Sequence, residues 1–294
     1  MPDWTAPFAI AAGSVVGHEH VRRGPMFVGA NNQDAHIVAR SKRSGCLIGV
    51  VSDGCSSHER SEIGAIVSAS SVWKSVSRMA VSRLSEMGEI GDAGWDSVRY
   101  DLLTSLSAMG AILACDPEDY IFATVIGFVI SPETTTVFHI GDGFYAVNGE
   151  LERLLPASGN RPPYPVYDTY LMPVTDEDGA EFTEQIGENP FSFRRRTWPT
   201  SEVSSVLIAS DGFGDLVDAE GMPLPFQPSQ SVPNASSFST DDTWYSSPHR
   251  LTHFLAACNN DTVRLNDDGG LDRRRGLLSD DTTIVVARRI EDGA

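Results

Sequence analysis

The chain has 294 residues, and 41% of them are hydrophobic, which is enough to build a sizeable core and to fold alone. The 22 Lys and Arg residues stand against 40 Asp and Glu residues, so the formal charge of −18 disfavours nucleic acid and anionic lipid as partners, although such acidity also serves solubility. The four cysteines form no Cys-x-x-Cys pair and no apolar stretch approaches the length of a membrane span, so we expect a cytoplasmic protein without structural zinc or a membrane segment.

Short apolar runs rich in β-branched residues predict strands along much of the chain. They lie at residues 37–39, 46–51, 121–130, 136–140, 144–147, 206–209 and 283–287. Amphipathic segments predict helices at residues 61–84, 96–114 and 249–257. Because two long helices follow one another among the strands and do not alternate with them, the pattern predicts an α+β sandwich with helices packed outside sheets.

Two regions break this periodicity. Residues 156–200 are rich in Pro, Gly and acids, and residues 218–248 are rich in Ser, Pro and Asp. Both predict long loops within a single domain spanning residues 1–294. Loops of this length serve as functional lids or are poorly ordered, and the sequence leaves both alternatives open.

Four aspartate motifs stand where apolar strands end or begin. They are Asn32-Gln33-Asp34, Ser52-Asp53-Gly54, Ser210-Asp211-Gly212 and Asp280-Asp281-Thr282-Thr283. An Asp before Gly often does no more than cap a turn, which is the alternative for each motif. Carboxylates that a sheet brings together repel one another unless a cation lies between them, and hard divalent ions prefer oxygen ligands. The motifs therefore predict a hydrolytic metal centre.

The order of these motifs resembles a known family once two further motifs are added. Phe122-Ala123-Thr124 and Ile140-Gly141-Asp142-Gly143 lie between the second and third aspartate motifs. From about residue 13 to residue 288 the chain resembles the metal-dependent protein phosphatases of type 2C, also called the PPM family, and looks most like the bacterial branch. The resemblance implies a four-layer αββα sandwich of two antiparallel β-sheets flanked by helices. It also implies two Mn²⁺ or Mg²⁺ ions at one edge and hydrolysis of a phosphate ester.

The resemblance assigns metal ligands position by position. Asp53 looks like the carboxylate that bridges both ions, and the Gly54 carbonyl like a further ligand. Asp211 and Asp280 look like ligands of one ion. Asp142 is a candidate for the weaker third ion that some family members bind.

One catalytic residue is assigned by the resemblance, and the other is proposed because the chain differs from the family's motif at one position. Asp34 would hold a metal-bound water, which would attack phosphorus directly without a covalent enzyme intermediate. Eukaryotic members carry a His directly after the Asp-Gly pair that is thought to protonate the leaving alkoxide, whereas Cys55 stands there in this chain. His58 is near enough in sequence to substitute.

A second departure concerns the substrate phosphate. The family often has an Arg three residues before the Asn of its first motif, and this chain has Gly29 at that position. Some other cation must grip the phosphate, and the candidates just upstream are His20, Arg22 and Arg23, among which a bidentate guanidinium would fit best. A surface loop position is the alternative for His20.

These observations predict a serine/threonine phosphoprotein phosphatase that acts on phosphoproteins, with a cognate serine/threonine kinase as a further partner. The first alternative is a catalytically weak pseudophosphatase that binds or regulates, which Gly29 and Cys55 motivate. The second alternative is hydrolysis of a small phosphorylated metabolite.

Overall fold

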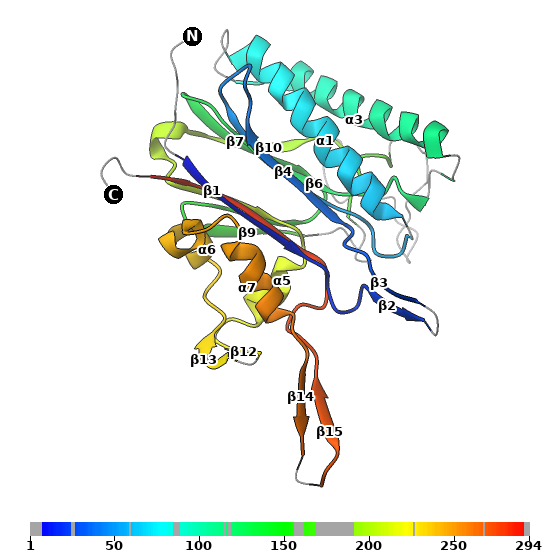
Figure 1. Cartoon of the computed structure of the whole chain (residues 1–294). Helices are drawn as coiled ribbons and strands as arrows, with labels where there is room; N and C mark the ends of the chain where they lie inside the picture. The colour runs from blue at the N-terminus through cyan, green and yellow to red at the C-terminus, as the bar shows by residue number, and fades with distance from the viewer. Residues whose placement is uncertain are drawn as a thin grey trace.

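The protein is described by a computed structural model (Figure 1). The model describes residues 8–24, 27–58, 60–84, 89–113, 116, 119–155, 162–167, 191–225, 227–266 and 268–290. Two five-stranded antiparallel sheets face each other, and helices cover the outer face of each sheet. The predicted α+β fold, a four-layer αββα sandwich, is confirmed.

Sheet I has the strand order β1-β16-β11-β8-β9. Its strands are β1 (Phe8–Val15), β16 (Thr282–Arg289), β11 (Ser205–Ala209), β8 (Gly143–Val147) and β9 (Glu150–Leu154). All five residues of β11 and the first six of β16 are buried. Because both faces of these strands are covered, their sequences read as continuous apolar runs.

Sheet II has the strand order β10-β7-β6-β5-β4. Its strands are β10 (Arg194–Pro199), β7 (Thr134–Ile140), β6 (Val125–Ile130), β5 (Leu47–Asp53) and β4 (Asp34–Arg40). Between the two sheets, Val51 and Ile126 of sheet II share one apolar cluster with Ile208 and Val285 of sheet I. This inner cluster fixes the two sheets against each other.

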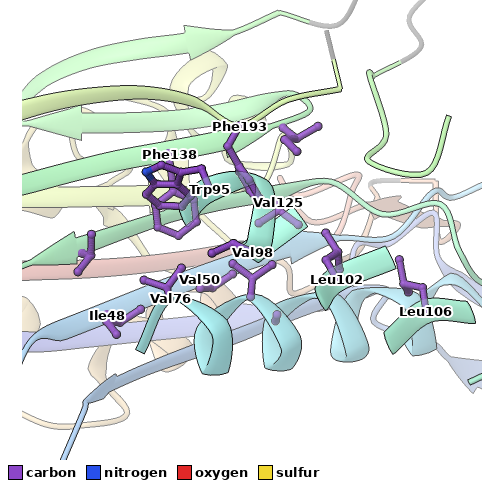
Figure 2. Close-up of a cluster of buried hydrophobic side chains, with 14 of the residues drawn as sticks. Ile48, Val50, Val76, Trp95, Val98, Leu102, Leu106, Val125, Phe138 and Phe193 are labelled. Atoms are coloured by element: carbon purple, nitrogen blue, oxygen red, sulfur yellow. The ribbon is translucent and has the colours of Figure 1, made fainter. Parts of the chain in front are cut away.

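Two long helices cover the outer face of sheet II. They are α1 (Ser61–Met79), which continues as the π-helix η1 (Ala80–Leu84), and α3 (Asp92–Leu113). Figure 2 shows Val98, Leu102 and Leu106, spaced four residues apart on α3, in one cluster with Ile48 and Val50 of β5. This spacing places them on one stripe of the helix, as predicted. Full burial of each such side chain stabilises the fold by roughly 1.5–3 kcal/mol.

Three shorter helices cover the outer face of sheet I (Figure 1). They are α5 (Phe213–Asp218), α6 (Ser237–Thr240) and α7 (Arg250–Cys258). Their apolar contacts to the sheet are carried by a cluster that includes Phe213, Phe238, Leu251 and Leu255. Helix α7 matches the helix predicted at residues 249–257.

Three two-stranded hairpins and two short 3-10 helices complete the described chain. The hairpins are β2 (Val21–Gly24) with β3 (Phe27–Ala30), β12 (Pro223–Leu224) with β13 (Gln227–Ser231), and β14 (Thr262–Leu265) with β15 (Leu271–Arg274). The 3-10 helices are η4 (Thr200–Glu202) and η5 (Asp242–Tyr245). The β14–β15 hairpin projects from the body of the molecule (Figure 1). Among the described residues, no helix is both long and apolar enough to cross a bilayer.

The prediction of a loop over residues 156–200 is wrong at its end. Strand β10 pairs with β7 from Arg194 to Pro199 as the edge of sheet II. Most of its side chains are exposed, and its charged residues break the apolar alternation by which a strand is predicted from sequence. Charged residues on an edge strand also discourage aggregation through that edge. Residues 156–161 and 168–190 of the predicted loop lie outside the described residues. Among the described residues of the loop predicted at 218–248, the regular elements after α5 are the short β12, β13, α6 and η5.

Candidate active site

Four of the predicted aspartates stand at one edge of the sandwich. Asp34 begins β4 and Asp53 ends β5, and the two residues are direct partners in the antiparallel register. Asp211 follows β11 and Asp280 precedes β16, and these strands are also antiparallel neighbours. Burial, followed by the charges of Asp211, Asp34 and Asp280, raises the pKa of Asp53, so these acids lie close enough to affect one another. The sandwich therefore brings together acids from both sheets.

Asp34 links the two sheets. Its side chain is buried, and its Oδ2 accepts a hydrogen bond of 2.7 Å from Ser210 Oγ, which belongs to the segment after β11. The same hydroxyl accepts a bond of 3.0 Å from the Thr283 N–H. The other carboxylate oxygen, Oδ1, is buried and has no hydrogen-bond partner among the described residues. One oxygen of Asp34 is thus fixed, and the other is free for a ligand.

The backbone around Asp53 is held by three hydrogen bonds. Asp53 N–H donates to Thr124 Oγ1 at 3.3 Å, Thr124 N–H donates to the Asp53 carbonyl at 2.8 Å, and Ser52 Oγ donates to the Thr124 carbonyl at 2.6 Å. At Gly54 a Cβ would lie 2.7 Å from the Ser61 carbonyl oxygen and 2.8 Å from that of Gln33. Only glycine allows this close approach of the backbone.

Asp142 lies in the turn between β7 and β8. Both of its neighbours, Gly141 and Gly143, have positive φ angles, of 112° and 122°, which side chains rarely tolerate. Burial, followed by the charge of Asp211, raises the pKa of Asp142 to about 7. The turn therefore places the Asp142 carboxyl group where burial and the charge of Asp211 disfavour its ionised form.

The pKa values of Asp34, Asp53 and Asp280 are perturbed in the same direction. Burial raises the pKa values of Asp34 and Asp53 well above their usual range, and the charges of neighbouring aspartates add to the effect. Burial and then the charge of Asp211 raise the pKa of Asp280 to about 6. A cluster with these pKa values binds protons or cations to relieve its repulsion.

His20 faces the acids and is not a solvent-exposed loop residue. Its side chain is 16% exposed, its Nε2 lies 3.3 Å from Asp280 Oδ1, and its Nδ1 lies 2.9 Å from Asp281 Oδ2. The contact with Asp281 raises the pKa of His20, against the opposing effect of burial. In its protonated form His20 offsets part of the negative charge of the Asp280-Asp281 pair.

Two further acids organise the site, and no role was predicted for either of them, although Asp281 belongs to the fourth aspartate motif and Asp215 lies close behind the third. Asp281 is 2% exposed and binds two backbone N–H groups in addition to its contact with His20. Asp215 Oδ2 accepts hydrogen bonds from the Ser279 N–H, the Ser279 hydroxyl and the Asp280 N–H, at 2.6, 2.8 and 3.2 Å. The only signal in the sequence is their proximity to Asp280 and Asp211, which does not reveal what they bind.

The other predicted residues are placed less fully. The His58 ring lies 4.7 Å from that of Phe122, and its Nδ1 is 3.1 Å from Ser57 Oγ, which lies 3.1 Å from Cys55 Sγ. Arg22 and Arg23 belong to strand β2, and their side chains lie outside the described part of the structure. Their role in gripping phosphate stays a prediction.

The donor set of the site fits a hard divalent cation. Within the described chain, no three His, Cys, Asp or Glu side chains stand in an arrangement that would hold a metal ion as they lie. The carboxylates at the edge nevertheless offer only oxygen donors, and Oδ1 of Asp34 is buried without a partner. Their raised pKa values show that a bound positive charge would stabilise them.

Comparison with known proteins points to one family. A family model described as Protein phosphatase 2C matches residues 16–256. No curated protein matches the chain significantly.

Among solved structures, a bacterial serine phosphatase has 13% identity and a TM-score of 0.47, covering 97% of this chain and 99% of that one. The serine/threonine phosphatase Stp1 from Staphylococcus aureus has 13% identity and a TM-score of 0.45, covering 96% and 94%. The PstP catalytic domain in complex with two manganese ions has 16% identity and a TM-score of 0.44, covering 97% and 99%.

Proposed function

Because the chain belongs to the protein phosphatase 2C family, we propose that it is a metal-dependent phosphatase that hydrolyses phosphoserine and phosphothreonine in proteins. The observation that supports this proposal most directly is the meeting of Asp34, Asp53, Asp211 and Asp280 at one edge of the sandwich. The raised pKa values of Asp34, Asp53 and Asp280 suit these acids to bind cations.

Two Mn²⁺ or Mg²⁺ ions would be held by Asp53, the Gly54 carbonyl, Asp211 and Asp280, and Asp142 would serve a weaker third site. When bound, the ions would supply the positive charge that acidifies a water molecule and stabilises the phosphoryl oxygens. The protein's own contribution is to fix these oxygen donors on strand ends. The hydrogen bonds around Asp53 contribute by fixing the backbone from which its carboxylate projects.

Asp34 would orient the attacking water. Ser210 occupies Oδ2 of Asp34, so the unpartnered Oδ1 is the oxygen available to accept a hydrogen bond from that water. A carboxylate in this place holds the nucleophile and receives its proton. Burial of Asp34 keeps bulk water from competing for the same oxygen.

His58 would protonate the leaving alkoxide, and Arg22, Arg23 or His20 would grip the phosphate. His58 stands four residues after Gly54 and packs on Phe122, beside the loop that Cys55 begins. His20 lies close to two aspartates, which would neutralise part of its charge in the protonated form. This favours the guanidinium groups of Arg22 and Arg23 as the phosphate ligands.

The proposed substrate is a phosphoprotein made by a cognate serine/threonine kinase in the cytoplasm. The experiment that tests the activity is hydrolysis of p-nitrophenyl phosphate with Mn²⁺, with Asp53→Asn as the inactive control. A metal-dependent rate that Asp53→Asn abolishes supports the phosphatase. No metal-dependent rate leaves the pseudophosphatase, which the departures at Gly29 and Cys55 favour. Slow hydrolysis of phosphothreonine peptides beside fast hydrolysis of a phosphorylated metabolite would favour the metabolite alternative.

A further inference from the structure

The carboxylate of Asp281 is buried among nitrogen donors from two distant segments. Its Oδ1 accepts a hydrogen bond of 2.7 Å from the Gly17 N–H, and its Oδ2 accepts one of 2.5 Å from the Gln33 N–H. Nδ1 of His20 lies 2.9 Å from the same Oδ2. Because both oxygens are directed at N–H groups of the protein, Asp281 differs from Asp34, which keeps one oxygen free.

Gln33 extends this connection to the loop after β5. The Gln33 carbonyl accepts a hydrogen bond of 3.1 Å from the Gly54 N–H, so a continuous path runs from Asp281 through Gln33 to Gly54. Each residue of this path is covalently joined to one acid of the candidate site, namely Asp280, Asp34 and Asp53. The path therefore runs directly behind the acids.

We propose that Asp281 is a positioning residue, the centre of a hydrogen-bonded brace that sets the spacing of Asp280, Asp34 and Asp53, and not itself a metal ligand. The statement that these acids bind metal ions rests on the proposed function. Aspartates held this close repel one another before any cation is bound, so their loops must be tied by other bonds. Groups that orient ligands from behind in this way commonly control both affinity and rate.

Residues 17–20, which precede β2, lie alongside the chain that leads to Asp281. His18 N–H donates to the Leu278 carbonyl at 3.0 Å, and Glu19 N–H donates to the Ser279 carbonyl at 3.1 Å, so the segment runs alongside the chain that leads to Asp280. A Cβ at Gly17 would overlap backbone atoms of Ser279 and Asp280. Glycine at this position lets the two backbones approach closely enough for Asp281 to accept the Gly17 N–H.

A carboxylate is required at position 281 because both of its oxygens accept backbone N–H groups. In Asp281→Asn one of them is replaced by an NH₂ donor that faces another donor, although the side chain keeps its size. We expect amide hydrogen exchange at Gly17 or Gln33 to accelerate at least about tenfold in this variant, because one of the two buried N–H groups loses its acceptor. Unchanged exchange at both amides would overturn the brace.

Calorimetric titration with Mn²⁺ separates positioning from ligation. If Asp281 positions the acids, Asp281→Asn should weaken Mn²⁺ binding by about 10–100-fold and leave the number of bound ions unchanged. Loss of one ion from the stoichiometry would identify Asp281 as a ligand and overturn the proposal. The matched control is Asp241→Asn at η5, where one carboxylate oxygen accepts a single bond of 2.8 Å from the Thr243 N–H that the amide oxygen of Asn can also accept, so this variant should change neither measurement.

Two further controls keep the test decisive. If the unmodified protein binds no Mn²⁺, the proposed function fails, and the exchange measurement still decides whether the brace exists. If Asp281→Asn does not fold, His20→Ala removes one of the three partners of the carboxylate while both backbone bonds remain. It should accelerate exchange at Gly17 and Gln33 by about two- to fivefold, and no acceleration would count against the brace.

Discussion

The hydroxyl of Ser210 lies 2.7 Å from Asp34 Oδ2 and joins the two sheets of the sandwich at their acidic edge. Ser210 follows β11 of sheet I, and Asp34 begins β4 of sheet II. The bond is buried, so its geometry is set by the packing of the sheets and not by solvent. It fixes Oδ2 of Asp34 and leaves Oδ1 as the oxygen available to a ligand.

Ser210→Ala should damage both stability and activity. The variant leaves Asp34 Oδ2 and the Thr283 N–H without this hydroxyl, and an unsatisfied buried polar group costs about 1–3 kcal/mol. Urea unfolding should report that loss. The rate on p-nitrophenyl phosphate should fall about tenfold or more because the freed carboxylate can rotate.

Ser205→Ala is the matched control for this prediction. The Ser205 hydroxyl is also buried in the same segment, but it has no hydrogen-bond partner among the described residues. Its removal should leave stability within about 0.5 kcal/mol or raise it, since no bond is lost. Equal losses in Ser205→Ala and Ser210→Ala would show that the Asp34 bond has no special role.

Gly54→Ala should destabilise the fold and abolish activity. The added methyl would meet the carbonyl oxygens of Ser61 and Gln33 at 2.7 and 2.8 Å, and both are backbone atoms that move only with their segments. Such overpacking typically costs about 1–3 kcal/mol. Thermal unfolding and the phosphatase assay measure the two effects. Gly91→Ala, whose methyl would meet nothing within 4 Å, should change stability by less than about 1 kcal/mol, and a comparable loss there would refute the steric explanation.

The acids at strand ends could be predicted because their motifs are local. An Asp that directly follows or precedes a buried run lies at a strand end in any sheet, and the family resemblance orders the strands. The partners of Asp281 could not be predicted, because Gly17 and Gln33 are 264 and 248 residues away. Their contact depends on how the segment before β2 runs along residues 278–281.

Edge strands were the weaker part of the fold prediction. Strand β10 carries Arg194, Arg195 and Arg196, and a run of three arginines indicates a solvated segment when the sequence is considered alone. Strand β10 forms because β7 presents an unpaired edge with which it can pair. That edge exists only once sheet II has assembled, so the local sequence does not reveal it. Strands inside the sheets, such as β11, carry a buried apolar run and were correctly predicted.

Asp211→Ala should lower both Mn²⁺ affinity and rate. Asp211 is the acid whose charge perturbs Asp53, Asp142 and Asp280, so its carboxylate is central to the cluster. Removing a direct ligand should weaken Mn²⁺ binding at least as much as removing a supporting group, which is about tenfold. Titration calorimetry measures the affinity. Asp218→Ala, an exposed acid at the end of α5, is the control, and unchanged Mn²⁺ binding in Asp211→Ala would contradict the ligand assignment.

His139 should make the protein sensitive to acid. It lies in β7 between β6 and β10, and burial, followed by the charge of Arg194, lowers its pKa to about 4. Between pH 6.5 and 4 the unfolded chain binds a proton at this residue and the folded chain does not, so the contribution of His139 to stability falls as pH falls, by on the order of 2–3 kcal/mol. The raised pKa values of Asp142 and Asp280 act in the opposite direction, so the test compares variants. On acidification across this range, urea unfolding should show a smaller loss or a larger gain of stability for His139→Gln than for the unmodified chain, while His253→Gln, which changes an exposed histidine of α7, keeps the original slope. Parallel curves for His139→Gln and the unmodified chain would exclude His139 as the source.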